Sequence, residues 1–351
     1  MKKVRIGFVG VGAMGQCAHL VNYATLKGCE VVAIAELRPK TADAVARKYG
    51  VPRVYADHRK MLDVEDLDGV VASQPFNRHA VLLPELYVRT KHLFTEKPLA
   101  VSVEAGERLV QAAAGAGCTH MVGYHKRSDP ATVYARSVID RWCASGEMGA
   151  LRYVRILMPA GDWIAEGFTG LIDAGDARPQ GLDVEPPMTD LDEETAKKYV
   201  AFVNYYIHQV NLMRHLLCEP YRVTCAEKSG VLLAVESDSG IPGVIEMTPY
   251  RTTVDWQEET LVAFEKGYVK LALPAPLAVN RAGSVEVYAD PGDGRTPERT
   301  SPTLPWVHAM RQQAVNFVGV IRGEMKPPCD AAEALEDLKV ARAYVRLRFG
   351  Q

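Results

Sequence analysis

The sequence lacks several features that would assign it to a specialised class of protein. No apolar run approaches the roughly 20 residues that cross a bilayer, and the opening MKKVRIGFVGVG breaks at glycines where a signal peptide would continue. No charge sign dominates, because 41 Lys and Arg oppose 43 Asp and Glu for a net charge of −2. We therefore expect no membrane segment and no nucleic-acid partner, since nucleic-acid binders usually carry a basic excess.

The cysteines and histidines also lack the spacing of metal sites and disulfide frameworks. The seven cysteines are scattered without a C-x-x-C pair, and the nine histidines form no H-E-x-x-H. Neither a G-x-S-x-G elbow nor a Walker lysine motif occurs. Free thiols are typical of a reducing compartment, so we predict a cytoplasmic protein without a bound metal. Its 48% of apolar residues is ample for a globular core.

A length of 351 residues predicts two domains at about 150 residues each. The first third alternates apolar strands with helices, a pattern typical of βαβ units and a parallel sheet, and residues 1–125 are assigned to it. Strands are expected at Val4–Val9, Glu30–Ala35, Gly69–Ser73, His92–Thr95 and His120–Gly123. Helices are expected at Ala13–Lys27, Lys40–Tyr49, Leu82–Tyr87 and Val103–Ala116.

From about Leu151 the pattern changes to short β-like runs without intervening helices. They are expected at Leu151–Met158, Tyr221–Ala226, Gly230–Glu236, Gly243–Met247, Glu259–Phe264, Tyr268–Leu273 and Ser284–Tyr288. Such a series predicts an α+β domain with a large open, mostly antiparallel sheet over residues 126–351. Helices are expected at Asp192–Leu217, Trp306–Arg322 and 331–349, and we expect the last to pack back on the first domain.

The run Gly10-Val11-Gly12-Ala13-Met14-Gly15 matches G-x-G-x-x-G, a motif that is weak on its own but here lies between an apolar strand and a helix, as its function requires. In that context Gly10 allows the tight turn, Gly12 admits a pyrophosphate, and Gly15 permits close helix–strand packing. It predicts a Rossmann dinucleotide-binding domain. Glu36 at the end of the second strand can bind ribose hydroxyls and repel a 2′-phosphate. This favours NAD, although Arg38 could offset the charge of Glu36 and leaves NADP open.

One segment differs from the rest by its charge. Residues 161–200 hold ten acids and three bases, and Pro186-Pro187 indicates a long loop that leads into a helix. Long loops are usually lids, binding loops or disordered segments, and a solvated surface excursion is the alternative. At the entrance of an active site, this charge would favour neutral or amino-bearing substrates over polyanionic ones.

Further motifs follow two strands of the first domain. Gln74-Pro75-Phe76-Asn77-Arg78-His79 and Glu96-Lys97-Pro98-Leu99, together with the glycine motif, resemble the Gfo/Idh/MocA oxidoreductases. This family includes glucose–fructose oxidoreductase and inositol dehydrogenase, and the likeness covers nearly the whole chain, including Phe317–Pro328 and Ala332-Glu333-Ala334-Leu335 near its end. The expected cofactor-binding residues are Gly10, Gly12, Ala13, Met14, Gly15, Glu36, Arg38, Gln74, Pro75, Asn77, His79, Glu96 and Lys97.

The resemblance also implies catalytic residues. Pro98 keeps Lys97 extended at a strand's carboxyl end, where open α/β sheets bind ligands, so Lys97 can exchange a proton with a hydroxyl. A surface lysine is the alternative. The family carries an aspartate and, four residues later, a histidine on one helix; the matching run here is Asn204-Tyr205-Tyr206-Ile207-His208. His208 is thus the expected general base, with the spacing of four placing it on the same helical face as Asn204.

Asn204 departs from the family pattern, because an asparagine can orient an imidazole but cannot stabilise imidazolium by charge. One hypothesis is that a carboxylate of the acidic segment compensates, with Asp162, Asp173 and Asp176 as candidates. Alternatively, the polar residues around position 208 form a structural stripe on the helix.

The substrate residues are expected where the last strand of the first domain ends. Tyr124-His125-Lys126-Arg127-Ser128-Asp129-Pro130 occupies the place of the family's G-[FY]-x-x-R-x-x-P segment. Lys126 and Arg127 would donate to a substrate or form interdomain salt bridges, and Trp163 would pack on a sugar face or in the core. The predicted substrate-binding set is Lys97, Tyr124, His125, Lys126, Arg127, Asp162, Trp163, Tyr205 and His208.

The function that the resemblance implies is hydride transfer between NAD(P) and a secondary hydroxyl or ketone of a sugar, glycoside or cyclic polyol. Two alternatives remain open. One is redox-neutral glycoside processing with recycled NAD, through C3 oxidation and elimination. The other is a non-catalytic NAD sensor, which only the Asn204 departure supports and which the retained Glu96-Lys97-Pro98 and His208 oppose. The open sheet with apolar strands predicts a homodimer or homotetramer.

Overall fold

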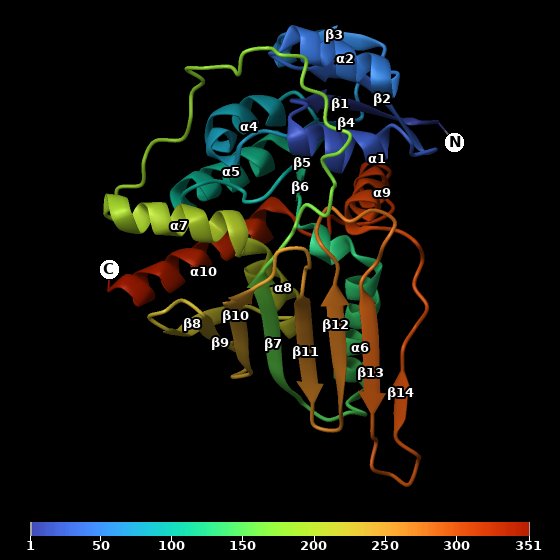
Figure 1. Ribbon diagram of the computed structural model, residues 1–351, viewed down its shortest axis with the longest axis vertical. Helices are drawn as coiled ribbons and strands as arrows, with labels where there is room; N and C mark the ends of the chain where they lie inside the picture. The colour runs from blue at the N-terminus through green and yellow to red at the C-terminus, as the bar shows by residue number, and fades with distance from the viewer. Residues whose placement is uncertain (1, 351) are drawn as a thin grey trace. The chain divides into compact units, whose positions relative to one another are not determined.

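The chain divides into two compact units, each built around its own sheet (Figure 1). The computed structural model describes residues 2–350. Unit 1 contains the residues up to Tyr124 together with Glu166–Thr189 and Met310–Leu338. Unit 2 contains His125–Ala165, Asp190–Ala309 and the residues from Lys339 onward. Each unit is therefore assembled from segments that are far apart in the sequence.

Unit 1 is a six-stranded parallel sheet in the order β3-β2-β1-β4-β5-β6, which is the Rossmann order and confirms the predicted domain type. Its strands are β1 (Val4–Val9), β2 (Cys29–Ala35), β3 (Arg53–Tyr55), β4 (Gly69–Ala72), β5 (His92–Thr95) and β6 (Thr119–Val122). Its helices are η1 (Gly15–Leu20), α1 (Val21–Tyr23), α2 (Pro39–Tyr49), α3 (His58–Val64), η2 (Phe76–Arg78), α4 (His79–Tyr87), α5 (Val103–Ala116) and α9 (Ala309–Ile321), which begins one residue before the unit's Met310.

The core of unit 1 forms because its central strands are apolar on both faces, as a parallel sheet covered by helices requires. Ile6 and Phe8 of β1 are fully buried, and Tyr23 of α1 packs edge-on against Phe8 with ring centroids 5.5 Å apart. Phe317 of α9 contacts the same core through Phe94 at 5.7 Å. The late segment of the chain is thus part of the first core.

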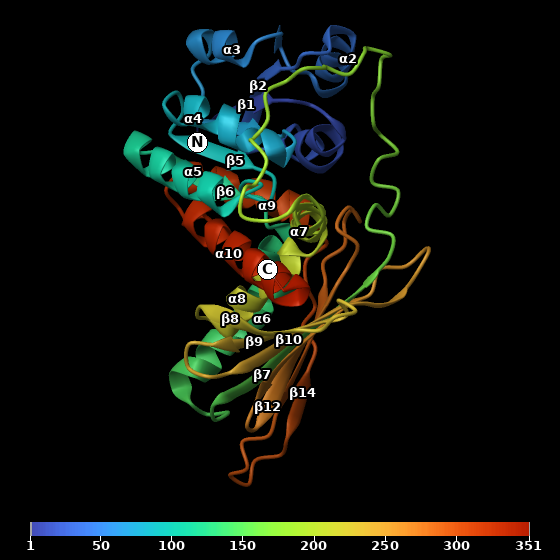
Figure 2. The same cartoon turned by 90° about the vertical axis from the view of Figure 1, so that its left-hand side faces the viewer.

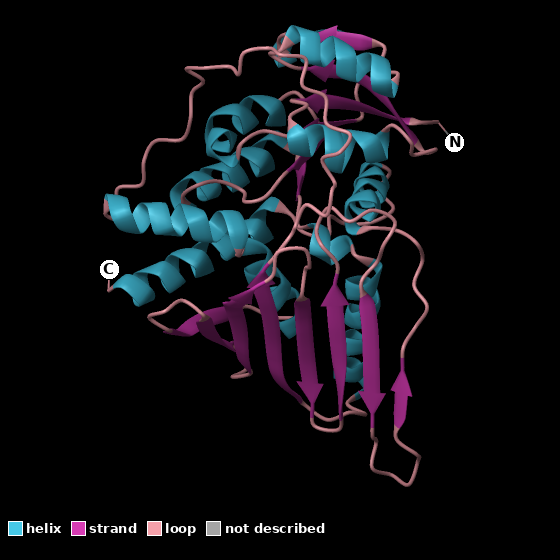
Figure 3. Ribbon diagram, viewed as in Figure 1, coloured by secondary structure: helices cyan, strands magenta, loops and turns pink. Residues whose placement is uncertain are grey.

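Unit 2 contains an eight-stranded sheet in the order β14-β13-β12-β11-β7-β10-β9-β8, mostly antiparallel with one parallel pair, β7–β10 (Figure 3). Side chains alternate between buried and exposed along β9 and β11, so one face of the sheet is packed. The helices α6 and α8 cover that face (Figure 2). The predicted mostly antiparallel sheet is therefore confirmed. The strands are β7 (Leu151–Ala160), β8 (Tyr221–Ala226), β9 (Leu232–Ser237), β10 (Pro242–Arg251), β11 (Glu258–Phe264), β12 (Gly267–Leu273), β13 (Ser284–Ala289) and β14 (Glu298–Thr300).

The helices of the second half differ from the expectation in two places. They are η3 (His125–Ser128), α6 (Pro130–Ser145), α7 (Glu193–Tyr205), α8 (Ile207–Leu217) and α10 (Ala331–Phe349). The expectation omitted α6, although its N-cap Asp129 followed by a proline is a helix-start signal. The expected single helix Asp192–Leu217 is wrong, because Tyr206 adopts φ −96° and ψ −2° and separates α7 from α8.

Membrane-spanning helices and clusters of metal-binding side chains do not occur in the described part of the chain. Among residues 2–350, no helix combines the length and apolar character needed to cross a membrane. Nor do three or more His, Cys, Asp or Glu side chains of those residues gather where they could hold a metal ion. All seven cysteines are free.

Two buried histidines of unit 1 are held in the neutral form. Burial lowers the pKa of His79 to about 4, and its Nδ1 lies 3.0 Å from the Leu99 carbonyl oxygen. Burial lowers the pKa of His120 to about 3. Its Nδ1 lies 2.9 Å from the Tyr87 hydroxyl oxygen, and its Nε2 lies 2.9 Å from the Thr95 hydroxyl oxygen. Neither ring is protonated in the folded protein at pH 5.

We predict that the protein loses stability when the pH falls from 7 to 5. The unfolded chain takes up protons at the ordinary histidine pKa, whereas folded His79 and His120 do not, so protonation pulls the equilibrium toward unfolding. The expected loss is about 2 kcal/mol per histidine at pH 5. Urea unfolding at the two pH values measures it, and His120→Gln should show a shallower pH dependence. Equal unfolding free energies at pH 7 and 5 would contradict this prediction.

Candidate active site

The glycine motif lies where the strand order of unit 1 reverses, at the carboxyl ends of the neighbouring strands β1 and β4. Gly10 has φ +90°, and a Cβ there would lie 2.6 Å from the Ser73 carbonyl oxygen. A Cβ at Gly15 would lie 2.9 Å from the Gly10 oxygen, whereas one at Gly12 would meet no atom of the described chain within 4 Å. Ala13 and Met14 begin the helix that follows. This cradle fits a dinucleotide pyrophosphate, with Gly12 as the open approach.

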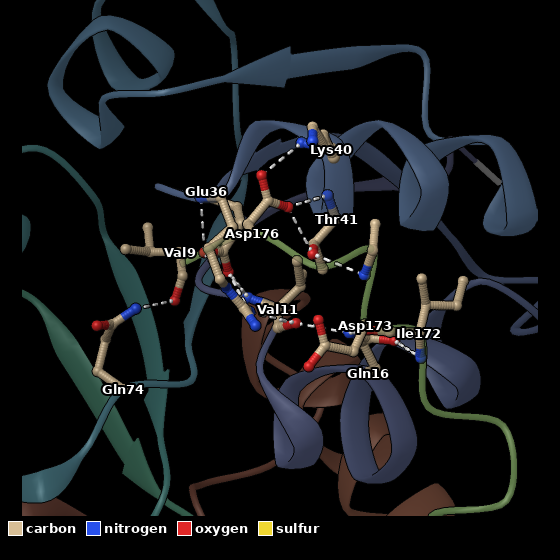
Figure 4. Close-up of polar contacts among 12 residues, drawn as sticks. Val9, Val11, Gln16, Glu36, Lys40, Thr41, Gln74, Ile172, Asp173 and Asp176 are labelled. Atoms are coloured by element: carbon tan, nitrogen blue, oxygen red, sulfur yellow. Dashed lines mark hydrogen bonds and ion pairs between the residues drawn. The ribbon is translucent and has the colours of Figure 1, made fainter. Parts of the chain in front are cut away.

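Glu36 places a carboxylate at the end of β2, next to the glycine loop (Figure 4). It accepts hydrogen bonds from the Val11 amide at 2.9 Å and from the Arg38 guanidinium at 3.0 and 3.1 Å. Burial alone would raise the pKa of Glu36, but the bonds from Arg38 and Val11 lower it below its usual value. The Glu36 carboxylate is therefore ionised in the folded protein, beside the glycine loop.

The loop after β4 brings further predicted cofactor residues to the same edge. Gln74 donates from Nε2 to the Val9 carbonyl at 3.1 Å, and Pro75 precedes the short helix η2. Asn77 accepts through its carbonyl a hydrogen bond of 2.7 Å from the Glu185 amide. His79 is buried in α4, so the described structure gives it a packing role.

Glu96 and Lys97 follow β5 at the same edge of the sheet. The Glu96 carboxylate lies 2.7 Å from Nε2 of His19, a residue of η1, and accepts from the Lys97 amide at 3.2 Å. Burial would raise the pKa of Glu96, but His19 and the Lys97 ammonium lower it overall. Lys97 is half-buried. The structure thus places an anion beside this lysine.

The acidic strap (Glu166–Thr189) belongs to unit 1 and is fixed there by specific hydrogen bonds. The Asp176 carboxylate accepts from the Thr41 amide at 2.7 Å and from the Lys40 amide at 3.2 Å, at the start of α2 (Figure 4). The Glu185 carboxylate accepts from the amides of Val101 and Ser102 at 2.9 and 2.8 Å, where α5 begins. Two of the strap's acids therefore serve as anchors at helix N-termini.

In unit 2, Glu258 forms the centre of a buried charged cluster. Its carboxylate pairs with the Lys126 ammonium and accepts from Gln209 Nε2 at 2.8 Å and Trp256 Nε1 at 3.2 Å. The side chains of Lys126 and Glu258 are 4% and 0% exposed. An ion pair that is this deeply buried is stable only because the additional donors to the Glu258 carboxylate are present as well. Lys126, expected to bind substrate, thus has a buried partner within its own unit.

His208 lies in the first turn of α8 and is half-buried, with its ring packed against His125 at 4.5 Å between centroids. Asn204 lies near the end of α7 and is exposed, so the expected shared helical face is interrupted at Tyr206. The half-buried Tyr205 packs edge-on against Tyr206 at 5.0 Å. The ring of His208 thus contacts His125, and the next residue of α8, Gln209, donates a hydrogen bond to Glu258.

Other predicted substrate residues also lie in unit 2, except the buried Tyr124 at the end of unit 1. Arg127 donates from Nε to the Asn211 side chain at 2.6 Å. A small hollow that is open to solvent is lined by His125, Lys126, Asp129 and Arg281 among others. Trp163 is half-buried on the loop after β7. Two predicted substrate residues, the sequence neighbours His125 and Lys126, thus line this hollow.

The three carboxylates hypothesised to assist His208 have main-chain partners elsewhere. Asp162 accepts from the Ile164 and Ala165 amides at 3.0 and 3.1 Å, and Asp173 accepts from the Gly175 amide at 3.1 Å. Asp176 binds α2. The buried carboxylate bonded to α8 is instead Glu258, which the sequence reasoning missed together with His19 and Arg281. No local motif marks these residues, because their partners are distant in the sequence.

Comparison with known proteins identifies relatives of the first unit most clearly. A family model described as "Oxidoreductase family, NAD-binding Rossmann fold" matches residues 4–124. Inositol 2-dehydrogenase from Acidothermus cellulolyticus is 33% identical over 132 residues, 37% of this chain and 38% of the relative. The scyllo-inositol 2-dehydrogenase (NAD(+)) of Bacillus subtilis is 25% identical over 259 residues, 70% of this chain and 67% of the relative.

The fold of the whole chain has counterparts among solved structures. Scyllo-inositol dehydrogenase from Lactobacillus casei, solved with NAD(H) and scyllo-inositol, matches with a TM-score of 0.68 at 19% identity, covering 99% of this chain and 97% of that chain. An identity this low shows the shared fold alone. Two of the curated relatives are matched over only 44% and 38% of their own length.

We predict that Lys126→Met destabilises the protein by about 3–5 kcal/mol, because it leaves Glu258 buried without its cation. The matched control is Lys270→Met, which removes a lysine whose ammonium lies 3.7 Å from Glu286 in a pair that is partly exposed. That variant should cost less than about 1 kcal/mol. Urea unfolding of both variants measures the difference, and equal costs would refute a structural role for the buried pair.

Proposed function

We propose that the chain is a Gfo/Idh/MocA oxidoreductase, an NAD-dependent enzyme that interconverts a secondary alcohol and a ketone, because residues 4–124 match that family's NAD-binding Rossmann model. Its substrate is proposed to be a sugar, glycoside or cyclic polyol. The observation that carries the proposal is the edge of unit 1, where the open glycine loop, Glu36 and Glu96-Lys97 follow three strands of one sheet. The inositol dehydrogenases among the relatives support the substrate class.

The proposed cofactor is held by this chain's glycine loop and by Glu36. Gly12 offers open backbone to the pyrophosphate, and the ionised Glu36 carboxylate receives the ribose hydroxyls. The nicotinamide ring supplies the hydride-transfer chemistry when bound. We favour NAD over NADP because a second anion beside Glu36 would be repelled.

The proposed catalytic groups are Lys97 and His208. Lys97 would donate a hydrogen bond to the substrate oxygen and stabilise the charge that develops on it, beside the Glu96 carboxylate. His208 would accept the hydroxyl proton, and the same groups would serve the reverse direction. Asn204 cannot supply the charge that stabilises imidazolium, so we assign that electrostatic role to Glu258, whose hydrogen-bond partner Gln209 follows His208.

A substrate screen tests this function. Purified protein with NAD is offered inositols, free sugars and glycosides while NADH absorbance is followed. NADH formation with a sugar or polyol supports the proposed dehydrogenase. Release of aglycone without net NADH would indicate the redox-neutral alternative, and NAD binding without turnover across the panel would indicate a sensor.

We predict that Lys97→Ala lowers kcat by about 10²–10⁴-fold with little change in cofactor affinity, because it removes a proton-exchanging donor from the substrate oxygen. Lys91→Ala is the matched control, since Lys91 is an exposed lysine just before β5. Gly12→Ala should have the opposite phenotype and weaken cofactor binding, because its Cβ would enter the open approach of the cradle. Full activity of Lys97→Ala would refute the assignment.

We further propose that the chain forms a homodimer or homotetramer through the sheet of unit 2. The face opposite α6 and α8 presents partly exposed Leu261 on β11, Leu157 on the neighbouring β7 and Leu232 on β9. Burying such a face against a second copy is favourable. Light scattering at micromolar concentration checks this, and a monomer mass would overturn it. The free cysteines support a reducing compartment such as the cytoplasm.

A further inference from the structure

Glu36 indicates where the 2′-phosphate, the group that distinguishes NADP from NAD, would lie in the proposed cofactor site. In Rossmann folds, the acid at this position contacts the 2′-hydroxyl of the adenosine ribose, the same oxygen that carries the extra phosphate of NADP. α2 begins at Pro39, three residues after Glu36, with Arg38 as its N-cap. First-turn amides of a helix and an arginine are the groups that hold a phosphate. A 2′-phosphate would therefore have to compete for α2 and Arg38.

The first turn of α2 already holds an anion of this chain. The Asp176 carboxylate accepts from the Thr41 amide at 2.7 Å, the Thr41 hydroxyl at 2.8 Å and the Lys40 amide at 3.2 Å (Figure 4). Burial alone would raise the pKa of Asp176, but these bonds lower it below its usual value. A charged carboxylate thus takes the donors that a phosphate would use.

Arg38 is also engaged. Its guanidinium binds both carboxylate oxygens of Glu36 at 3.0 and 3.1 Å and the Val11 carbonyl at 3.3 Å. The hydrogen bond to Glu36 chiefly raises the pKa of Arg38, and the charges of Asp173 and Asp176 raise it further. The charges of three carboxylates therefore act on Arg38, a cation that could receive a 2′-phosphate at this position.

Other contacts of the strap also hold Asp176 in place. They join the strap to η1, the helix that follows the glycine loop, and to α2. Gln16 and Ile172 exchange two hydrogen bonds, with Oε1 accepting at 2.9 Å and Nε2 donating at 3.0 Å. Lys48 donates to the Gly170 carbonyl at 2.7 Å, and the Ala174 amide donates to the Thr41 hydroxyl at 3.3 Å. The position of Asp176 is thus fixed by several independent contacts.

We propose that Asp176 is a specificity-determining residue that occupies the 2′-phosphate position of the cofactor site and thereby excludes NADP. The proposal rests on the proposed NAD-dependent function. It assigns to the strap a share of the selectivity for NAD over NADP that Glu36 alone does not explain. Glu36 repels the extra phosphate, whereas Asp176 additionally removes its hydrogen-bond donors. The acidic strap is then a component of cofactor recognition.

The test measures binding of NADH and NADPH to the full-length protein by nicotinamide fluorescence, and of 5′-ADP and 2′,5′-ADP by calorimetry. The variants are Asp176→Ala, which frees the donors of α2, and Asp176→Asn, which removes the charge but keeps an acceptor. Asp183→Ala is the matched control, because Asp183 is an exposed acid of the same strap. Thermal unfolding of each variant checks that it is folded.

The wild type should bind NADH and discriminate against NADPH. Asp176→Ala should raise the affinity for NADPH and 2′,5′-ADP about tenfold while NADH and 5′-ADP change less than about threefold. Asp176→Asn should show a smaller gain, and Asp183→Ala none. Unchanged NADPH affinity in both Asp176 variants, or an equal gain in Asp183→Ala, would overturn the role of Asp176. A wild type that binds NADPH as well as NADH also overturns it and leaves the oxidoreductase proposal standing, whereas binding of neither refutes both.

Discussion

Main-chain amides at the carboxyl edge of the parallel sheet require acceptors, and this requirement organises unit 1. Each loop that leaves this edge runs into a helix whose first amides have no partner within the helix. Glu36 takes the Val11 amide, Asp176 takes those at the start of α2, and Glu185 takes those at the start of α5. The glycine loop, where a Cβ at Gly12 would meet no described atom within 4 Å, is where we propose that an anion from outside the chain binds. The proposed cofactor contact and the attachment of the strap would then use the same physical interaction.

This requirement changes the meaning of the acidic segment. Its local negative charge suggested a filter at an active-site entrance, yet Asp176 and Glu185 bind main-chain amides of unit 1. Their charges are balanced in part by helix N-termini. The charge of these two acids therefore acts first on the fold of unit 1, whereas other acids of the strap, such as Asp183, are exposed.

In unit 2, the main electrostatic feature is one buried carboxylate, that of Glu258, which is surrounded by several hydrogen-bond donors. Glu258 binds Lys126, Gln209 and Trp256 from three segments of the chain, so it joins η3, α8 and the start of β11. Breaking such a cluster is costly because each partner would leave another uncompensated. The family pattern carries its charge at position 204, where this chain has asparagine. The buried carboxylate of Glu258, which accepts a hydrogen bond from Gln209, instead supplies α8 with an anion from β11.

The sequence by itself determined the unit types and most elements: β1, β5, α5 and β8 begin and end where the apolar periodicity predicted. It also identified the glycine loop, Glu36 and Glu96-Lys97, because these motifs are contiguous and their backbone roles are local. It missed α6, the break at Tyr206, and the partners of Asp176 and Glu258. Only the tertiary structure decided those partners: Asp176 meets Thr41 across 135 residues and Lys126 meets Glu258 across 132. The energy of such pairs comes from burial and from donors on other segments, which no local pattern encodes.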